Sequence, residues 1–212
     1  MSRGVIILGS GGHAKVLVDT LQQCGITIVG LVDETETGTA ATVLGAPFLG
    51  SEQLVFSRGT DTVELVNGVG SVRVPSARRA VYEKFKARGY RFATVVHPSA
   101  VVARDVVLGE GAQVLAGAVV QPGVVLGDNC LLNTRASVDH DCTIGAHTHV
   151  ASGAVLSGGV AVAEEVHIGA AAVVRQYLRI GDRALVAAGA VVIDDVAPGT
   201  CVAGVPAKAI AR

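Results

Sequence analysis

The sequence predicts two parts: a small α/β domain over residues 1–95 and a parallel β-helix over residues 96–212. The β-helix is indicated by an aliphatic residue at every sixth position from Val96 to Val192. The α/β domain is indicated by an apolar strand, residues 5–8, that runs into a glycine-rich turn. Composition agrees, because aromatic residues make up only 3% of the chain and the core must be filled by smaller aliphatic side chains.

The six-residue period continues without a break over residues 96–192, and every member of the column is Val, Leu or Ile. A companion column four residues later is mostly small. Neither an α-helix nor a simple strand of period two keeps this spacing. Each hexad is therefore interpreted as a short strand with a corner, and three hexads as one triangular coil. Seventeen hexads give between five and six coils, a rod roughly 25–30 Å long at the usual strand spacing.

The α/β domain alternates strands and helices after the first strand. Apolar residues recur at helical spacing from Ala14, and Gly25 ends that helix. Further strands are expected at 26–32 and 62–66, separated by a polar loop, and a second helix at 75–89. This βαβαβ order is half of a doubly wound nucleotide-binding fold.

The turn at residues 9–14 has the pattern G-x-G-x-x-A at the start of a helix. Backbone N–H groups and the helix dipole favour an anion there. Asp33 follows the second strand, where an acidic residue meets a ribose or a base. A glycine-rich turn can also serve only to let a helix pack closely. Because half of the fold suits a mononucleotide better than a dinucleotide, a sugar nucleotide is the expected ligand.

Charge, hydropathy and cysteine spacing argue against several other classes of protein. The net charge of −1 gives no reason to expect nucleic acid as a partner. No apolar run is long enough for a membrane span or a signal peptide, so a cytoplasmic protein with reduced thiols is expected. Cys130 and Cys142 belong to the small-residue column and are interpreted as core packing.

Three segments carry a resemblance to a known family: Gly-Gly-His at 11–13, the polar stretch 132–150, and Gly-Val-Pro-Ala-Lys at 204–208. The chain resembles the NeuD/PglD-like sugar O- and N-acetyltransferases, and most of all the 4-amino-4,6-dideoxysugar N-acetyltransferases, perosamine N-acetyltransferase included. The resemblance implies a left-handed β-helix, although ordinary parallel crossovers are right-handed. It also implies acetyl-CoA as co-substrate, a homotrimer, and GDP-perosamine or a UDP-linked relative as the acceptor of acetyl at its 4-amino group.

The same resemblance assigns a general base to His140 and an acidic neighbour to Asp141. Because adjacent strand residues point to opposite faces, Asp139 is a rival partner unless a corner lies between His140 and Asp141. His140 could instead hold the amine while the CoA thiolate takes the proton. Asn133 could orient the acetyl group or the sugar, or could be a stacked turn amide.

The remaining candidate residues fall into a donor group and an acceptor group. The resemblance assigns His149, Ala170, Ala188 and Lys208 to acetyl-CoA. Gly158 lies 18 residues after His140, which leaves room there for a thioester, and the same spacing stacks His149 on His167. Sugar-nucleotide contacts are expected at Gly11, Gly12, His13, Asp33, Glu34 and Gly68. Arg78 opens the second helix and could reach a phosphate or stay solvated.

Three other functions stay open at this point. The first is O-acetylation of sialic acid or a similar sugar at the same site. The second is a sugar-nucleotide-binding scaffold without catalysis. The third is a metal-dependent hydratase like the γ-class carbonic anhydrases, with His147, His149 and His167 as ligands; we expect no metal, because such an enzyme has no use for a nucleotide domain.

Overall fold

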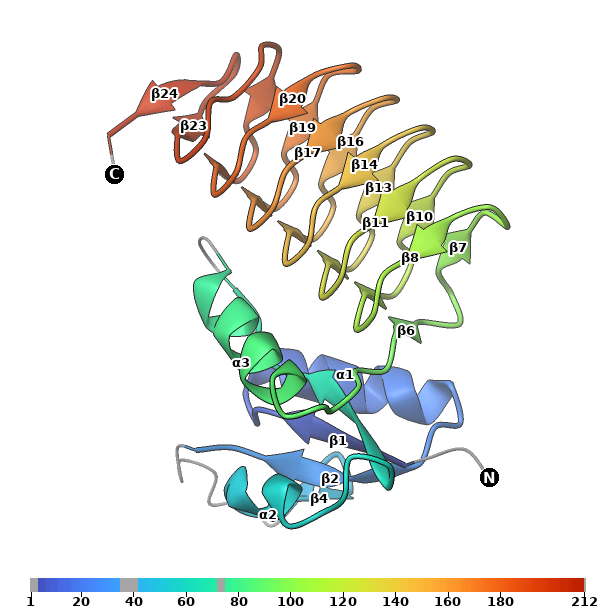
Figure 1. The fold of residues 1–212 in the computed structure, drawn as a ribbon. Coiled ribbons are helices and arrows are strands. Elements are labelled where there is room, and N and C mark those ends of the chain that lie inside the picture. The colour runs from blue at the N-terminus through green and yellow to red at the C-terminus, as the bar shows by residue number, and fades with distance from the viewer. Residues whose placement is uncertain (1–3, 35–41, 72–74, 212) are drawn as a thin grey trace.

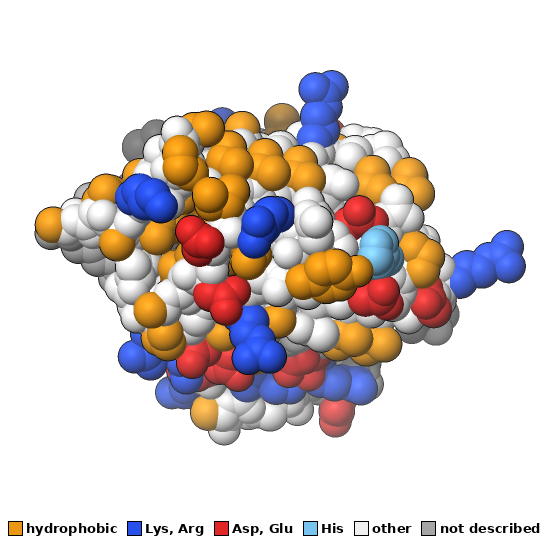
Figure 2. Space-filling view, turned by 90° about the horizontal axis from the view of Figure 1, so that it is seen from above, with side chains coloured by type: hydrophobic (Ala, Val, Ile, Leu, Met, Phe, Trp, Pro, Cys, Tyr) orange, Lys and Arg blue, Asp and Glu red, His pale blue; other side chains and the backbone are white. Residues whose placement is uncertain are grey.

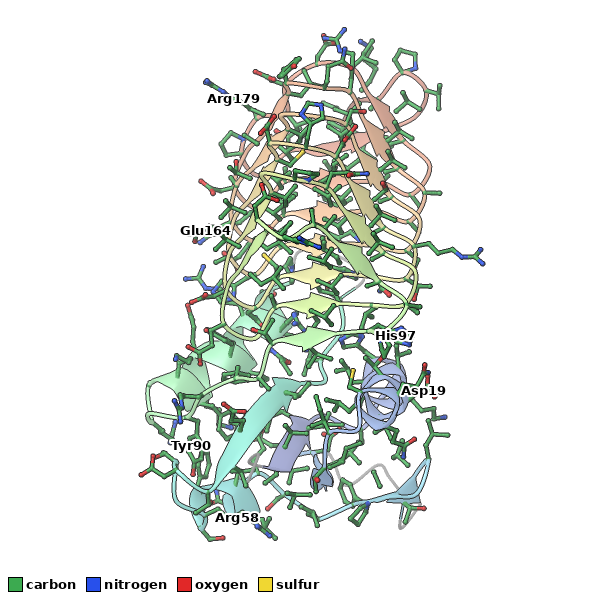
Figure 3. The ribbon with its side chains drawn as sticks, turned by 90° about the vertical axis from the view of Figure 1, so that its right-hand side faces the viewer. Asp19, Arg58, Tyr90, His97, Glu164 and Arg179 are labelled. Carbon is green, nitrogen blue, oxygen red and sulfur yellow. The ribbon has the colours of Figure 1, made fainter. Side chains whose placement is uncertain are left out.

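The computed structural model describes residues 4–34, 42–71 and 75–211, and it joins a small α/β domain to a long triangular coil of parallel strands (Figure 1). The parallel β-helix that the six-residue period predicts is confirmed. Figure 3 shows His97 where the chain passes from the α/β domain into the coil, with Glu164 and Arg179 farther along it.

The α/β domain is built on a three-stranded parallel sheet of order β2-β1-β5. Its elements are β1 (Gly4–Leu8), α1 (Gly12–Gln23), β2 (Ile28–Val32), β3 (Thr42–Val43), β4 (Ala46–Pro47), α2 (Gln53–Phe56), β5 (Val63–Asn67) and α3 (Ser76–Lys86). α1 packs on one side of the sheet, where Leu17 and Leu21 meet Leu115 and Leu131 of the coil. α3 and α2 pack on the other side, around Phe85.

The small elements β3, β4 and α2 correct the expectation of a plain polar loop between the second and third strands. The short hairpin pairs Val43 with Ala46, and Ala46 and Val55 are buried in the two cores. Apolar residues in this stretch fall in two short runs, 43–49 and 54–56, that are too short to show a helical or strand period, so no period marked them in the sequence.

The coil has three flat faces, which the chain visits in the order face 1, face 2, face 3. Face 1 consists of β6 (Val95–Val96), β9 (Gln113–Val114), β12 (Leu131–Leu132), β15 (His149–Val150), β18 (His167–Ile168), β21 (Leu185–Val186), β23 (Cys201–Ala203) and the antiparallel β24 (Lys208–Ile210). Face 2 consists of β7 (Val101–Val102), β10 (Val119–Val120), β13 (Ser137–Val138), β16 (Val155–Leu156), β19 (Val173–Val174) and β22 (Val191–Val192). Face 3 consists of β8 (Val107–Leu108), β11 (Val125–Leu126), β14 (Thr143–Ile144), β17 (Ala161–Val162) and β20 (Arg179–Ile180).

The core of the coil contains the two columns that the sequence predicts. The aliphatic column points inward from the strands and the small column fills the corners, so Leu132 and Cys142 are both fully buried. From β6 to β22 neighbouring coils pair at a spacing of 18 residues, as Leu131 with His149 and His149 with His167. The last coil is two residues shorter, so β21 pairs with β23 at a spacing of 16. The register fixes which side chains of successive coils lie beside one another.

A third column, which the sequence analysis missed, sets the shape of the corners. Every sixth residue from Gly111 to Gly189 has a positive φ, and about half of these are not glycine. Residues with a Cβ seldom adopt this left-handed conformation, so each corner turns sharply and redirects its side chain. Asp141 (φ 59°) and Tyr177 (φ 61°) belong to this column.

Candidate functional site

A cavity of about 600 Å³ lies between the α/β domain and face 1 of the coil. It brings together most of the residues expected to bind a sugar nucleotide, together with Asn133 and His149 of the coil. Its lining consists of Gly9, Ser10, Gly11, Gly12, His13, Val16, Asp33, Gly68, Val69, Gly70, Ser71, Leu131, Asn133 and His149.

The glycine-rich turn presents bare backbone to this cavity. A Cβ at Gly11 or Gly12 would meet no atom within 4 Å, so the space in front of the turn is open. α1 begins at Gly12, and its N-cap residue Gly11 makes no side-chain capping bond. The first N–H groups of α1 are therefore left for a ligand, and the helix dipole favours a negative charge there.

Gly68 has a different reason to be glycine. A Cβ at this position would lie 2.7 Å from the Leu8 carbonyl oxygen and 3.1 Å from the Ala14 Cβ. Its own N–H donates to the same carbonyl at 2.8 Å. Gly68 therefore lets the end of β5 approach β1 and α1 closely, which brings the loop 68–71 to the cavity.

The two acidic residues after β2 have separate environments. Asp33 lines the cavity, and its Oδ2 accepts bonds from the Ser10 backbone N–H at 2.9 Å and from the Ser10 hydroxyl at 2.7 Å. Asp33 thus ties the end of β2 to the glycine-rich turn. Glu34 does not line the cavity, because its exposed carboxylate forms an ion pair with Lys84 of α3.

His13 is held as a neutral imidazole with a defined tautomer. The Gln113 amide donates from Nε2 to the Asn67 carbonyl oxygen at 2.9 Å, so its Oε1 is the acceptor for His13 Nε2, also at 2.9 Å. The proton therefore sits on His13 Nε2 and leaves the Nδ1 lone pair free to accept. Burial, and after it the charge of Arg78, lowers the pKa of His13 to about 4.

His149 is fixed in the same way between the two parts of the molecule. Asn133 Oδ1 accepts from the Thr134 N–H, so Asn133 Nδ2 donates to His149 Nε2 at 3.2 Å. The other ring nitrogen, Nδ1, then donates to the Ser71 hydroxyl at 2.8 Å. Burial is the main reason why the pKa of His149 falls to about 3, and only 4% of the residue is exposed. His149 therefore reaches a ligand only through the cavity.

The predicted stack of His149 on His167 is confirmed. Their ring centroids lie 4.9 Å apart, and β15 and β18 pair the two residues in register. His147 lies apart from this pair, at the corner between faces 3 and 1, where it contacts Asn129 and Tyr82. Within residues 4–34, 42–71 and 75–211, no three His, Cys, Asp or Glu side chains gather as metal ligands would.

Arg78 corrects an expectation, because its guanidinium neither contacts the cavity nor is solvated. The residue is fully buried, and it donates to the carbonyl oxygens of Asn67, Val69 and Asn129 at 3.0–3.2 Å. It therefore fastens α3 and the end of β5 to the coil. Burial lowers the pKa of Arg78 to about 10, which still leaves the group charged at neutral pH.

Replacing Arg78 by alanine is expected to lower the free energy of unfolding by about 3–5 kcal/mol, because the carbonyl oxygens of Val69 and Asn129 lose their donor and a large buried side chain leaves a hole. Urea denaturation measures the change. Arg58→Ala removes an exposed arginine of the same domain and is the matched control, with an expected change within about 0.5 kcal/mol. Equal midpoints for the two variants would contradict the role given to Arg78.

His140 and Asp141 form a polar pair at the corner between faces 2 and 3. His140 Nδ1 lies 2.8 Å from Asp141 Oδ2, because the left-handed turn at Asp141 brings its side chain to the same side as the imidazole. Asp139 accepts instead from the backbone N–H of His140 at 2.8 Å. Asp141 is thus the partner of the ring, and its hydrogen bond is the main reason why the pKa of His140 is raised. Nδ1 carries the shared proton, so Nε2 is the atom free to accept another.

Gly158 is glycine because the imidazole of His140 occupies the space of a side chain. A Cβ at Gly158 would lie 2.5 Å from His140 Nε2 and 2.6 Å from Cε1. The expectation that this glycine leaves room for a thioester is therefore corrected: His140 itself fills the room. The gap lets the ring rest against the next coil, although 51% of the side chain stays exposed.

Comparisons with known proteins agree with both parts of the fold. The PglD N-terminal domain family matches residues 4–85, and the bacterial transferase hexapeptide family matches residues 123–158. The acetyltransferase domain of PglB from Neisseria gonorrhoeae FA1090 is 35% identical, with a TM-score of 0.91 over 99% of this chain and 100% of that one. PerB from Caulobacter crescentus, in complex with CoA and GDP-perosamine, is 36% identical, with a TM-score of 0.90 over 98% and 97%.

This chain belongs to the PglD-like hexapeptide acetyltransferases. WeeI from Acinetobacter baumannii AYE has the same architecture at 25% identity, with a TM-score of 0.81 over 99% of this chain and 100% of that one. A search of curated protein sequences gives no significant match.

The candidate residues of this PglD-like protein lie at four separate places on the coil. The cavity is on face 1, whereas His140 lies at the corner that face 1 does not border. Ala170 and Ala188 are exposed at the corner between faces 1 and 2, one coil apart. Lys208 is exposed on β24 at the C-terminal end. One chain therefore does not bring His140 to its own cavity.

Three residues of the PglD-like site escaped the sequence analysis: Ser10, Ser71 and Gln113. Gln113 carried a usable signal, because it occupies an outward position of face 1 where the neighbouring coils have Val95 and Leu131. A polar residue between two apolar neighbours in an outward column indicates a partner across an interface. Ser10 and Ser71 lie in irregular loops, where no period singles out a residue.

Among the described residues, no helix has the length and apolar character that crossing a bilayer requires.

Proposed function

We propose that this protein transfers the acetyl group of acetyl-CoA to the 4-amino group of a nucleotide-linked 4-amino-4,6-dideoxysugar. The observation that carries the proposal is the His140–Asp141 pair, which leaves one imidazole nitrogen free at an exposed corner. Its support is the likeness over nearly the whole chain to PerB, whose structure contains CoA and GDP-perosamine.

The chemistry needs a base and no covalent intermediate. The sugar amine attacks the thioester carbonyl carbon, the C–S bond breaks, and CoA leaves as a thiolate. His140 Nε2 accepts the proton that the amine loses, and the Asp141 carboxylate stabilises the imidazolium that forms. Of the cysteines in the coil, Cys130 and Cys142 are fully buried, and burial raises the pKa of both thiols, so neither is suited to carry the acyl group.

The acceptor fits the cavity with its phosphates at the glycine-rich turn. The N–H groups at the start of α1 would bind the diphosphate, and Asp33 would bind the ribose or the base. The sugar would then lie toward Asn133 and His149 at the coil end of the cavity. Guanine is the favoured base, since PerB binds GDP-perosamine.

Acetyl-CoA is assigned to the corner between faces 1 and 2. Backbone groups at Ala170 and Ala188 would contact its pantetheine arm, and the charge of Lys208 would meet its phosphates. Asn133 begins the same corner, closer to the cavity, and would orient the acetyl group. An acetyl-CoA enzyme of this kind would act in the cytoplasm.

A homotrimer would complete the site, because His140 and the cavity lie on different sides of one coil. Face 2 supports this assembly with a column of outward valines that only Ser137 interrupts: Val101, Val119, Val155, Val173 and Val191. Figure 2 views the coil from the side away from the α/β domain, and hydrophobic side chains lie in rows there. Contiguous apolar surface of this kind is typical of a contact with another chain. His140 of one copy would then face the cavity of the next.

A thiol-release assay with acetyl-CoA tests the proposal. The acceptors are GDP- and UDP-linked 4-amino-4,6-dideoxysugars, with free sialic acid beside them. Turnover with an amino sugar nucleotide is the expected result, and the preferred nucleotide identifies the base. Activity on sialic acid alone would replace the proposal by O-acetylation.

Replacing Asp141 by asparagine is expected to move the acidic limb of the pH–rate profile to lower pH. The base acts when unprotonated, so the rate rises with pH through the pKa of His140. The hydrogen bond to Asp141 raises this pKa, and its loss lets the pKa fall toward the ordinary 6.5. The rate at the alkaline plateau falls as well, because a weaker base accepts the proton less readily.

Asp139→Asn is the control for this shift, because the Asp139 carboxylate bonds the backbone and not the ring. A smaller displacement of the acidic limb is expected there. An unchanged limb in Asp141→Asn would contradict the assignment of His140 as the titrating base.

A further inference from the structure

Tyr177 is the only aromatic residue of the coil, since the other six in the sequence precede residue 95. Five of those six pack against one another, as Tyr82 does with Phe92 and Phe56 with Phe85. Tyr177 instead is 74% exposed. An exposed tyrosine offers a large and rigid apolar surface to any ligand or chain that lies beside this polar corner, and covering that surface is favourable.

The ring of Tyr177 has a fixed place on the corner between faces 2 and 3. Tyr177 follows Asp141 and Gly159 in the left-handed column, one coil farther each time. Its Cδ1 and Cε1 lie 2.4 and 2.6 Å from where a Cβ of Gly159 would be, so the ring lies directly on that glycine. Its N–H donates to the Gly158 carbonyl oxygen at 3.0 Å. The missing side chain at Gly159 therefore seats the phenol ring.

The two rings share one surface. His140 covers Gly158 from one side and Tyr177 covers Gly159 from the other, and these two glycines are adjacent in the chain. His140 Nε2, the nitrogen that Asp141 leaves free, points toward this surface. Whatever group reacts at Nε2 therefore lies next to the apolar ring of Tyr177.

The level of Tyr177 along the coil decides which substrate it meets. The cavity for the acceptor touches β12 and β15, whereas Tyr177 lies between β19 and β20, in the same coil as Ala170. Side-by-side coils keep their levels, so Tyr177 lies on the donor side of His140. We propose, on the basis of the proposed function, that Tyr177 is a specificity-determining residue whose ring walls the acyl end of acyl-CoA and excludes acyl chains longer than acetyl.

Acyl-chain profiles of the wild type and of two variants test this role. Acetyl-, propionyl- and butyryl-CoA are compared by kcat/KM at a saturating amino sugar nucleotide. One methylene in an apolar pocket discriminates roughly 10–200-fold, so the wild type is expected to prefer acetyl-CoA steeply. Tyr177→Ala is expected to reduce the acetyl-to-butyryl ratio at least about 10-fold, and Tyr177→Phe, which keeps the ring, to preserve it.

The corner tolerates alanine, because Ala171 adopts the same left-handed conformation six residues earlier (φ 55°). Arg183→Ala replaces the next non-glycine residue of that column and is the control, with an unchanged acyl-chain profile expected. Sedimentation of each variant reports its assembly.

The outcomes separate this inference from the function on which it rests. An unchanged acetyl-to-butyryl ratio in Tyr177→Ala would contradict the specificity role of Tyr177. Dissociation of the assembly in this variant would contradict it as well, because Tyr177 would then be a contact between copies. If the wild type has no turnover with any amino sugar, the proposed function fails. Equilibrium binding of the three thioesters then still tests the role of Tyr177. The wild type is expected to bind acetyl-CoA more tightly than butyryl-CoA, and Tyr177→Ala is expected to lose this difference. The same preference in the wild type and in Tyr177→Ala would contradict the role.

Discussion

Replacing His140 by alanine is expected to lower kcat/KM for the amino sugar by about 10²–10⁴-fold, the usual contribution of a general base. The amine then has no acceptor for its proton, because Nε2 of this imidazole is the nitrogen that Asp141 leaves free. Folding is expected to change little, since half of the side chain is exposed and surface substitutions usually alter stability by less than about 0.5 kcal/mol. Thiol release at saturating acetyl-CoA measures the loss.

Arg104→Ala is the matched control, because Arg104 is an exposed residue of the same corner column, two coils before His140. Full activity is expected there. If kcat/KM falls by less than about 10-fold in His140→Ala and the pH profile is unaltered, His140 is not the general base. The CoA thiolate would then accept the proton, and His140 would only hold the amine.

Replacing Gly158 by alanine is expected to lower the activity almost as much, although it removes no group that reacts. The new Cβ would lie 2.5 Å from His140 Nε2, far inside contact distance, so the ring must swing away. A displacement of about 1 Å at a reacting atom costs roughly 10²-fold in rate. Because Gly158 has no left-handed φ, the backbone accepts alanine, and kcat should fall while both KM values and the melting temperature stay close to those of the wild type.

Gly59→Ala is the control for Gly158→Ala. A Cβ at Gly59 meets only Thr62 Cγ2, at an ordinary 3.7 Å, in a loop of the α/β domain. Wild-type kcat in Gly158→Ala would mean that the imidazole has a second working position, and the assigned geometry would be wrong.

The coil could be predicted almost residue by residue, because one physical constraint repeats in every turn of it. Each hexad must bury one aliphatic and one small side chain, so the period alone predicts the positions of Leu132 and Ala136 in the core. The left-handed corner column follows the same period but mixes Gly, Asn and larger residues, so composition hid it. Without it, the choice between Asp139 and Asp141 as partner of His140 could not be made.

Contacts between the two parts could not be predicted, because they join residues far apart in the chain with no shared period. Arg78 is the clearest case: a charged residue at the start of a helix suggests solvent or a phosphate, and only the fold surrounds it with carbonyl oxygens. His149 is similar, since the sequence indicates a functional histidine but not that Ser71 and Asn133 hold both of its nitrogens.

The 18-residue register that holds from β6 to β22 also limits how such a protein can change in evolution. An insertion of one residue within a strand would turn the following side chains to the wrong side, whereas a change of length at a corner can be absorbed, as between β21 and β23, where pairing resumes after 16 residues. Insertion or loss of a whole coil would leave the columns intact. The separation along the coil between His140 and the C-terminal strand β24 can therefore vary only in increments of about 4.8 Å, the spacing of paired strands. The number of coils therefore determines how long a surface the fold can offer to an elongated cofactor.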